Sequence, residues 1–113
     1  MPYRDDPGAT DRWYEVLCGA VAVAKRQDAL VDRSLEFLHI SVTEKSAPRD
    51  ELDASFREVR AALRQVEEQL VVARRAAESL DEGDPKVRAQ LYEIEALHKT
   101  MSGILAAAEE RFG

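Results

Sequence analysis

The chain has little cysteine, proline and glycine, and no long apolar run. It contains one cysteine, Cys18, with four prolines and five glycines in 113 residues. A single cysteine excludes an intrachain disulfide and a thiolate cluster for zinc, and it is typical of a reducing compartment. The longest apolar run, residues 16–24, is far shorter than the roughly 20 residues of a membrane-spanning helix. We therefore expect a cytoplasmic protein with no membrane partner.

The chain also lacks an excess of positive charge. Its 16 Lys and Arg residues are outnumbered by 22 Asp and Glu residues, which gives a net charge of -6. Nucleic-acid and anionic-lipid surfaces are bound through clustered basic residues, whereas the basic residues here alternate with acidic ones. The sequence has no Gly-rich phosphate loop and no Ser-His-Asp pattern. We expect no nucleic-acid partner, no cofactor and no enzymatic activity.

What the chain does contain favours helix. Ala, Glu, Leu, Arg and Val dominate, and helix-breaking residues fall in three places. Residues 1–9 predict a flexible arm, and Thr10 or Asp11 can cap the first helix. Pro48 suits the first turn of a second helix, and the segment around Gly83 suits the end of that helix and the start of a third. A single helical bundle over residues 10–113 is expected, with helices near 10–45, 49–81 and 85–112.

Apolar residues repeat in heptads along the expected helices. The second helix alternates spacings of four and three, as do most of the third and first. The expected core positions of the second and third helices are Leu52, Phe56, Val59, Leu63, Val66, Leu70, Ala73, Ala77, Leu80, Val87, Leu91, Ile94, His98, Met101, Leu105, Ala108 and Phe112. Because the connections are short, consecutive helices must run antiparallel. The pattern predicts an all-α, up-down-up three-helix bundle with a coiled-coil-like core. A break in the first helix near residue 26 would give a four-helix bundle instead.

The first expected helix carries a second apolar row beside its heptad positions. Val16, Val23, Leu30 and Phe37 are spaced by seven residues. This row either widens the buried face of the helix or binds another chain, since exposed apolar stripes mark interaction sites. We expect these four residues to be the partner-binding residues.

Two Glu-x-x-His motifs raise the question of a metal site. Glu36 with His39, and Glu95 with His98, each place a carboxylate and an imidazole one turn apart, as ferritin-like di-iron bundles do. In the expected topology, however, the two motifs differ in height by about 12 residues, or roughly 18 Å. The metals of a di-metal site are only about 3.5–4 Å apart. A metal-binding ferritin-like oligomer is therefore an alternative that would need symmetry-related copies.

The two histidines allow other interpretations. His98 interrupts the apolar face of its helix, which predicts a structural histidine bonded to Glu67, Glu68, Gln65 or Glu95. An exposed histidine could serve phosphotransfer, and Arg33 followed by His39 matches the loose spacing of small helical ribonucleases. Our principal expectation is a non-enzymatic helical module (an adaptor, a chaperone or a small subunit) that binds a protein partner or itself through the first helix.

Overall fold

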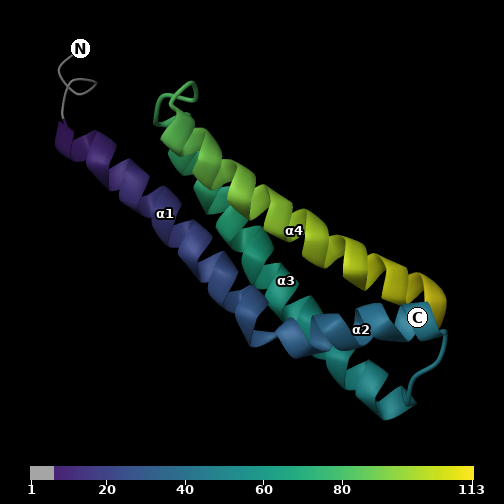
Figure 1. Cartoon of the computed structure of the whole chain (residues 1–113). Coiled ribbons are helices and arrows are strands. Elements are labelled where there is room, and N and C mark those ends of the chain that lie inside the picture. Colours follow the sequence, from purple (N-terminus) through teal and green to yellow (C-terminus); the bar gives the residue numbers. More distant parts are fainter. Residues whose placement is uncertain (1–6) are drawn as a thin grey trace.

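The computed structural model describes the backbone of residues 7–113 and the side chains from residue 11 onward. Within this range the chain forms helices only, which confirms the all-α class (Figure 1). The helices are α1 (Pro7–Leu30), α2 (Asp32–Glu44), α3 (Arg49–Glu78) and α4 (Pro85–Phe112). The expected arm lies outside the described residues except for 7–9, which are helical and not flexible coil. Thr10 and Asp11 lie within α1, so neither caps it.

The helices form an elongated rod of 60 × 20 × 17 Å. α1 and α2 follow one another along the rod and hardly contact each other, whereas each packs against both α3 and α4 (Figure 1). α3 returns antiparallel to them, and α4 runs antiparallel to α3. A first helix running unbroken from 10 to 45 was therefore a wrong expectation. The interruption falls at Val31, five residues beyond the position near 26 that we considered.

The break at Val31 has no helix-breaking residue to cause it. No Gly or Pro occurs between Ala20 and Ala47, whereas sharp kinks usually arise at such residues. Val31 has φ -112° and ψ 17°, and its side chain caps no backbone group of α2. Because Val31, Leu35 and Leu38 are all buried, tertiary packing of α2 on α3 and α4 redirects the chain here. Local sequence preference alone would have continued the helix.

The core follows the heptads closely. Most of the expected positions on α3 and α4 are buried, and Leu63, Leu80, Leu91 and Phe112 are partly buried against the same cluster. Ile94, Met101, Leu38 and Leu17 are among the largest fully buried side chains. Small residues lie in the C-terminal halves of α1 and α3, where these two helices pack together, and their size lets the helices approach closely. These are Ala20, Ala24, Ala73, Ala76 and Ala77, all buried.

In the connection between α3 and α4, the end of α3 and the role of Gly83 differ from what the sequence predicted. α3 ends at Glu78 and not near 81, and Gly83 donates its backbone N–H to Asp81 Oδ1 at 2.9 Å, away from the helix end. The second half matches the expected chemistry, because the Asp84 side chain accepts a 2.9 Å hydrogen bond from the Lys86 N–H and Pro85 opens α4. None of the described helices is both long enough and apolar enough to cross a membrane.

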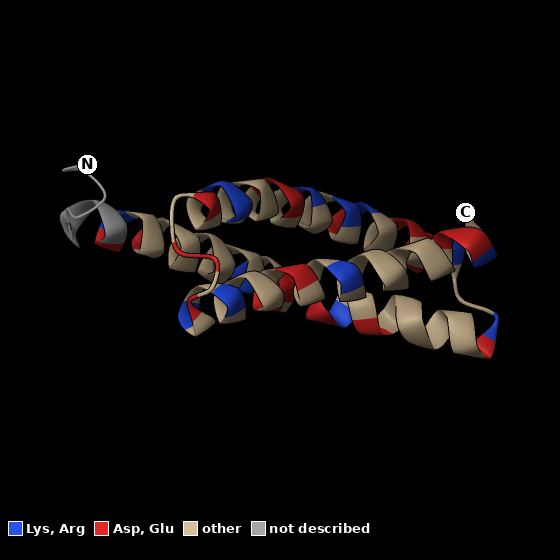
Figure 2. Cartoon of the chain, turned by 90° about the horizontal axis from the view of Figure 1, so that it is seen from above, with Lys and Arg blue, Asp and Glu red and all other residues tan. Residues whose placement is uncertain are grey.

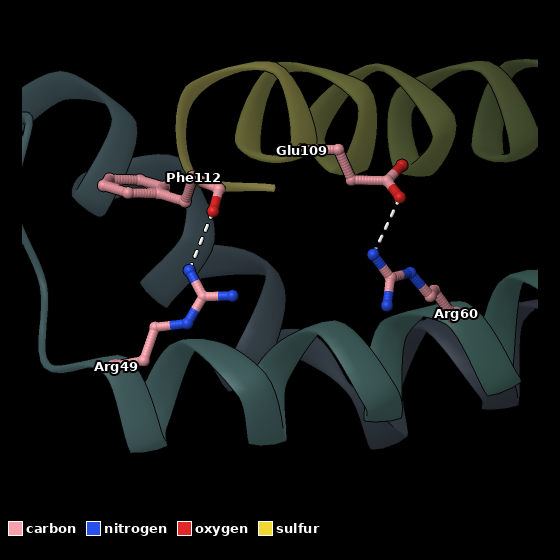
Figure 3. Close-up of polar contacts among 4 residues, drawn as sticks. All are labelled: Arg49, Arg60, Glu109 and Phe112. Carbon is pink, nitrogen blue, oxygen red and sulfur yellow. Dashed lines mark hydrogen bonds and ion pairs between the residues drawn. The ribbon is translucent and has the colours of Figure 1, made fainter.

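Arginine side chains of α3 fasten it to the last turns of α4 (Figure 3). Arg49 Nη1 donates to the Phe112 carbonyl at 2.7 Å, and Arg60 Nη2 lies 2.8 Å from Glu109 Oε2. The Arg60 guanidinium also lies 5.0 Å from the centre of the Phe56 ring. Arg49 and Arg60 are thus both engaged with groups of α4, which makes this end of the rod a structural junction.

Candidate partner-binding surface

The apolar row of the first helix lies on the side of the rod next to α3. Lys25 forms an ion pair with Glu93 of α4, so its side of α1 faces α4. Val16, Val23 and Leu30 lie about 140–180° around the helix from Lys25. They therefore occupy the opposite flank, where α1 borders α3. Phe37 continues the row across the break, on the side where the Ser34 hydroxyl donates to the Glu58 carboxylate of α3.

Exposure divides the row into two parts. Leu30 is 71% exposed and Val16 is 40% exposed, so both can contact another molecule. Val23 is half-buried, and Phe37 packs against the core. The Ser41 hydroxyl donates to the Phe37 carbonyl at 2.7 Å, within α2. The row thus contributes apolar surface mainly along α1, and its α2 end serves the core.

The neighbouring flank of α3 adds residues that the heptad pattern did not single out. Val72 is 38% exposed and lies on the α1 side, because it stands about 160° around the helix from Arg74, which pairs with Glu95 of α4. Ala61, Gln65 and Gln69 on this flank carry no charge, and the charged Glu68 and Arg75 border it. We call the combined surface the α1–α3 strip: Val16, Gly19, Val23 and Leu30 of α1 with Ala61, Gln65, Gln69 and Val72 of α3. An apolar residue directly beside a heptad position was the available signal for Val72.

Elsewhere the surface charges alternate in sign. Figure 2 shows Lys and Arg interleaved with Asp and Glu along the helices. Tyr92, on α4, is 74% exposed, but Arg88 and Glu95 border it in a shallow hollow. Trp13, Ile40 and Val71 are also exposed outside the strip, at 42%, 43% and 49%. The α1–α3 strip is therefore marked by several apolar side chains grouped together without a charge among them.

His98 lies at the edge of the core and not inside it. Its side chain is 27% exposed, and Nε2 lies 3.2 Å from Glu67 Oε2 and 3.4 Å from the Ser102 hydroxyl oxygen. Of the four partners that the sequence suggested, Glu67 is the one in contact. Glu95 instead accepts a 3.0 Å hydrogen bond from Arg74. These contacts make His98 part of a polar link between α3 and α4.

The remaining residues of the two Glu-x-x-His motifs do not lie next to His98. Glu36 and His39 are exposed on α2, and the His39 carbonyl accepts a 3.2 Å hydrogen bond from the Thr43 hydroxyl. Among the residues with described placement, no three His, Cys, Asp or Glu side chains group as metal ligands would. Arg33 is exposed on the first turn of α2.

Two titrating groups of α1 are shifted by their surroundings. The hydrogen bond with Cys18 raises the pKa of Tyr14, with further contributions from desolvation and from the charges of Cys18 and Asp84. Burial, followed by the charge of Asp32, raises the pKa of Asp28. Asp28 and Asp32 are four residues apart, a spacing that brings their two carboxylates close together on the helical chain around Val31.

Comparison of the chain with models of protein families, with curated proteins and with solved structures finds no match.

Proposed function

We propose that the protein is a non-enzymatic helical interaction module that binds a protein chain, either a different one or a copy of itself, through the α1–α3 strip. The observation that carries the proposal is the exposure of Leu30 and Val16, at 71% and 40%, within a strip that has no charged side chain. Leaving such side chains in water forgoes about 25 cal/mol for each Å² of apolar surface that a partner would cover. An exposed apolar patch bordered by polar residues is typical of an interaction site.

The shape of the molecule supports the same proposal. In our interpretation α1 and α2 act together as the first of three rods in an up-down-up bundle, since both pack on α3 and α4. Two adjacent helices then present a long, even face, which suits docking of another helical surface. The free, half-buried thiol of Cys18 fits a cytoplasmic location, which we propose for the module.

The proposal is tested by capture of binding proteins on immobilised chain from the native extract. Wild-type protein is compared with Leu30→Glu, which places a charge at the most exposed position of the row without touching the core. Retained proteins are identified by mass spectrometry. We expect at least one protein, the chain itself included, to bind wild type and to be lost from Leu30→Glu, because a buried unpaired carboxylate opposes contact strongly.

Tyr92→Glu is the matched control. Tyr92 is exposed to the same extent as Leu30 but lies on α4, away from the strip, so this variant should retain every partner of the wild type. Circular dichroism should show equal helix content in all three proteins. Identical sets of retained proteins for wild type and Leu30→Glu would contradict the proposal.

A further inference from the structure

We propose that the occupant of the α1–α3 strip is a second copy of this chain, packed strip to strip so that α1 of each copy lies on α3 of the other. This inference rests on the proposed function and names its partner. It is drawn from the charges along the two rims of the strip and from the register between α1 and α3.

Four exposed charges that border the strip have no partner among the side chains that the structure describes. Glu15 and Arg26 lie along the α1 rim, and Glu68 and Arg75 lie along the α3 rim. Among the described residues, none of these four makes an ion pair or hydrogen bond. Other surface charges nearby are paired within the chain, such as Arg74 with Glu95.

The hydrogen bond between Ser34 of α2 and Glu58 of α3 gives the approximate register, and heights along α1 are counted back from it through the break at Val31. Arg26 precedes Ser34 by about eight residues, and Glu68 follows Glu58 by about ten, so the two lie within about 3 Å of the same height. The same count places Glu15 and Arg75 within about 3 Å of each other in height. Opposite charges therefore stand at matching levels on the two rims, and the like charge of Arg64, at the height of Arg26 to within about 3 Å, lies farther from the strip on α3.

A two-fold axis parallel to the rod preserves height and exchanges the rims. Arg26 of one copy then meets Glu68 of the second copy, and Glu15 meets Arg75. Each such pair occurs twice in the dimer. Between the rims, Leu30 covers the second copy's Ala61 and Gln65, and Val16 approaches its Val72. The strip is thus complementary to itself in charge, and its most exposed apolar residue meets uncharged partners.

A two-fold axis perpendicular to the rod is the less favourable arrangement. It would also oppose Glu15 and Arg26, this time between the two copies of α1. However, Leu30 would then lie against Arg12 of the second copy, which occupies the same side of α1 as Leu30, and this places a large apolar side chain beside a charged guanidinium. The parallel axis avoids this mismatch, and we infer it for that reason.

Beyond Leu30 the complementarity ends. Arg33 and Arg57 stand within about 3 Å of the same height with like charge, so the contact covers α1 and does not extend along α2. A face of about 19 residues along α1 and two helices wide buries roughly 1,000 Å² in total, near the lower bound for a specific interface. We therefore expect a dissociation constant in the micromolar range, roughly 1–100 µM.

The test is sedimentation equilibrium of the full chain, from about 1 to 200 µM at low salt, where rim ion pairs are least screened. Arg26→Glu and Glu68→Arg are each expected to weaken the homodimer roughly tenfold, because each replaces two attractive contacts by two repulsive ones. Lys99→Glu and Glu110→Arg make the same charge changes on the exposed surface of α4 and should leave the constant unchanged.

Mixing the two strip variants discriminates between the arrangements. In a mixed pair with the parallel axis, Glu at position 26 of one chain meets Arg at position 68 of the other, and the second contact is the unchanged Arg26–Glu68 pair, so both contacts are attractive. Arg26→Glu and Glu68→Arg chains should therefore associate with each other to within about threefold of wild type. A mixture that stays as weak as its components, or rescue of Arg26→Glu by Glu15→Arg alone, would overturn this arrangement.

The outcome also separates this inference from the proposed function. A wild-type chain that remains monomeric at about 200 µM overturns the homodimer, whatever else binds. If Leu30→Glu nevertheless abolishes capture of a different protein, the interaction module stands without the self-association. If Leu30→Glu affects neither, both proposals fail.

Discussion

Lys45 ends α2 in a conformation that its side chain disfavours. Its φ is 63° and its ψ is 16°, and it is the only non-glycine residue of the described chain with positive φ. Left-handed backbone costs an L-residue about 1–2 kcal/mol because Cβ crowds the following carbonyl. Helices commonly end in this conformation at Gly, which has no Cβ. Lys45→Gly should therefore stabilise the protein.

The magnitude follows from three contributions. Relief of the left-handed strain adds about 1–2 kcal/mol, and the greater freedom of Gly in the unfolded chain removes about 0.4–1 kcal/mol. Loss of the positive charge at the C-terminal end of α2 removes about 0.3 kcal/mol more at this exposed position. The net expectation is a gain of about 0.5 kcal/mol in the free energy of unfolding.

Urea denaturation followed by circular dichroism measures this change, with two variants to isolate the cause. Lys45→Gln loses the charge but keeps the strain, so it should fall about 0.3 kcal/mol below wild type. Glu44→Gly puts the glycine one residue earlier, inside α2, and should cost about 0.5–1 kcal/mol.

The difference in free energy of unfolding between Lys45→Gly and Lys45→Gln tests whether the left-handed backbone of residue 45 is the cause. We expect Lys45→Gly to exceed Lys45→Gln by about 0.8 kcal/mol, the part due to backbone conformation alone. If Lys45→Gly is instead destabilised as much as Glu44→Gly, residue 45 has no left-handed conformation in solution. The assignment of the α2 end would then be wrong.

Two further predictions concern the core and the break. Leu38→Ala should cost about 2–5 kcal/mol, because Leu38 is fully buried where α2 meets α3 and α4; an unchanged urea midpoint would show that α2 is not docked. Asp28→Asn should stabilise the protein at pH 7 by about 0.2–0.5 kcal/mol, because it removes a partly buried charge and its repulsion with Asp32. The raised pKa of Asp28 means that its ionisation destabilises the folded state, so this gain should vanish below its ordinary value of 3.8, where Asp28 is protonated in both states. Thermal unfolding at pH 7 and near pH 3 tests the difference, and a gain that persists at the lower pH would contradict it.

Local signals allowed much of the helix map to be predicted. The start of α4 follows from Asp84 and Pro85, whose capping and fixed φ act within one turn and need no tertiary contact. The buried face of α3 follows from its heptads, because one helix between two neighbours must turn its apolar stripe inward. Both features depend on residues close together in the sequence.

The break at Val31 could not be predicted in the same way. The residues around it are compatible with continuous helix, and the preference is overridden by contacts of Leu35 and Leu38 with distant helices. His98 illustrates a second limit: a heptad position gives the side of a helix but not its depth, and a polar residue can lie at the edge of the core, where Glu67 reaches it.

The candidate surface was predictable in part. Spacing alone placed Val16, Val23, Leu30 and Phe37 in one row, but it could not divide exposed from buried members, since that depends on how far α3 covers each. Val72 belongs to the same strip only because α1 and α3 are adjacent and antiparallel. The rim charges became informative for the same reason, once the register between the helices was known.

The rod shape has a practical consequence for how the molecule moves in solution. Its radius of gyration is 17.3 Å, whereas a compact chain of this length has about 13 Å. A body so extended has a high frictional coefficient for its mass, so a single chain elutes from a gel-filtration column at the position of a larger sphere. Elution volume alone would therefore report a dimer even for a monomer, and only methods that respond to mass can count the chains.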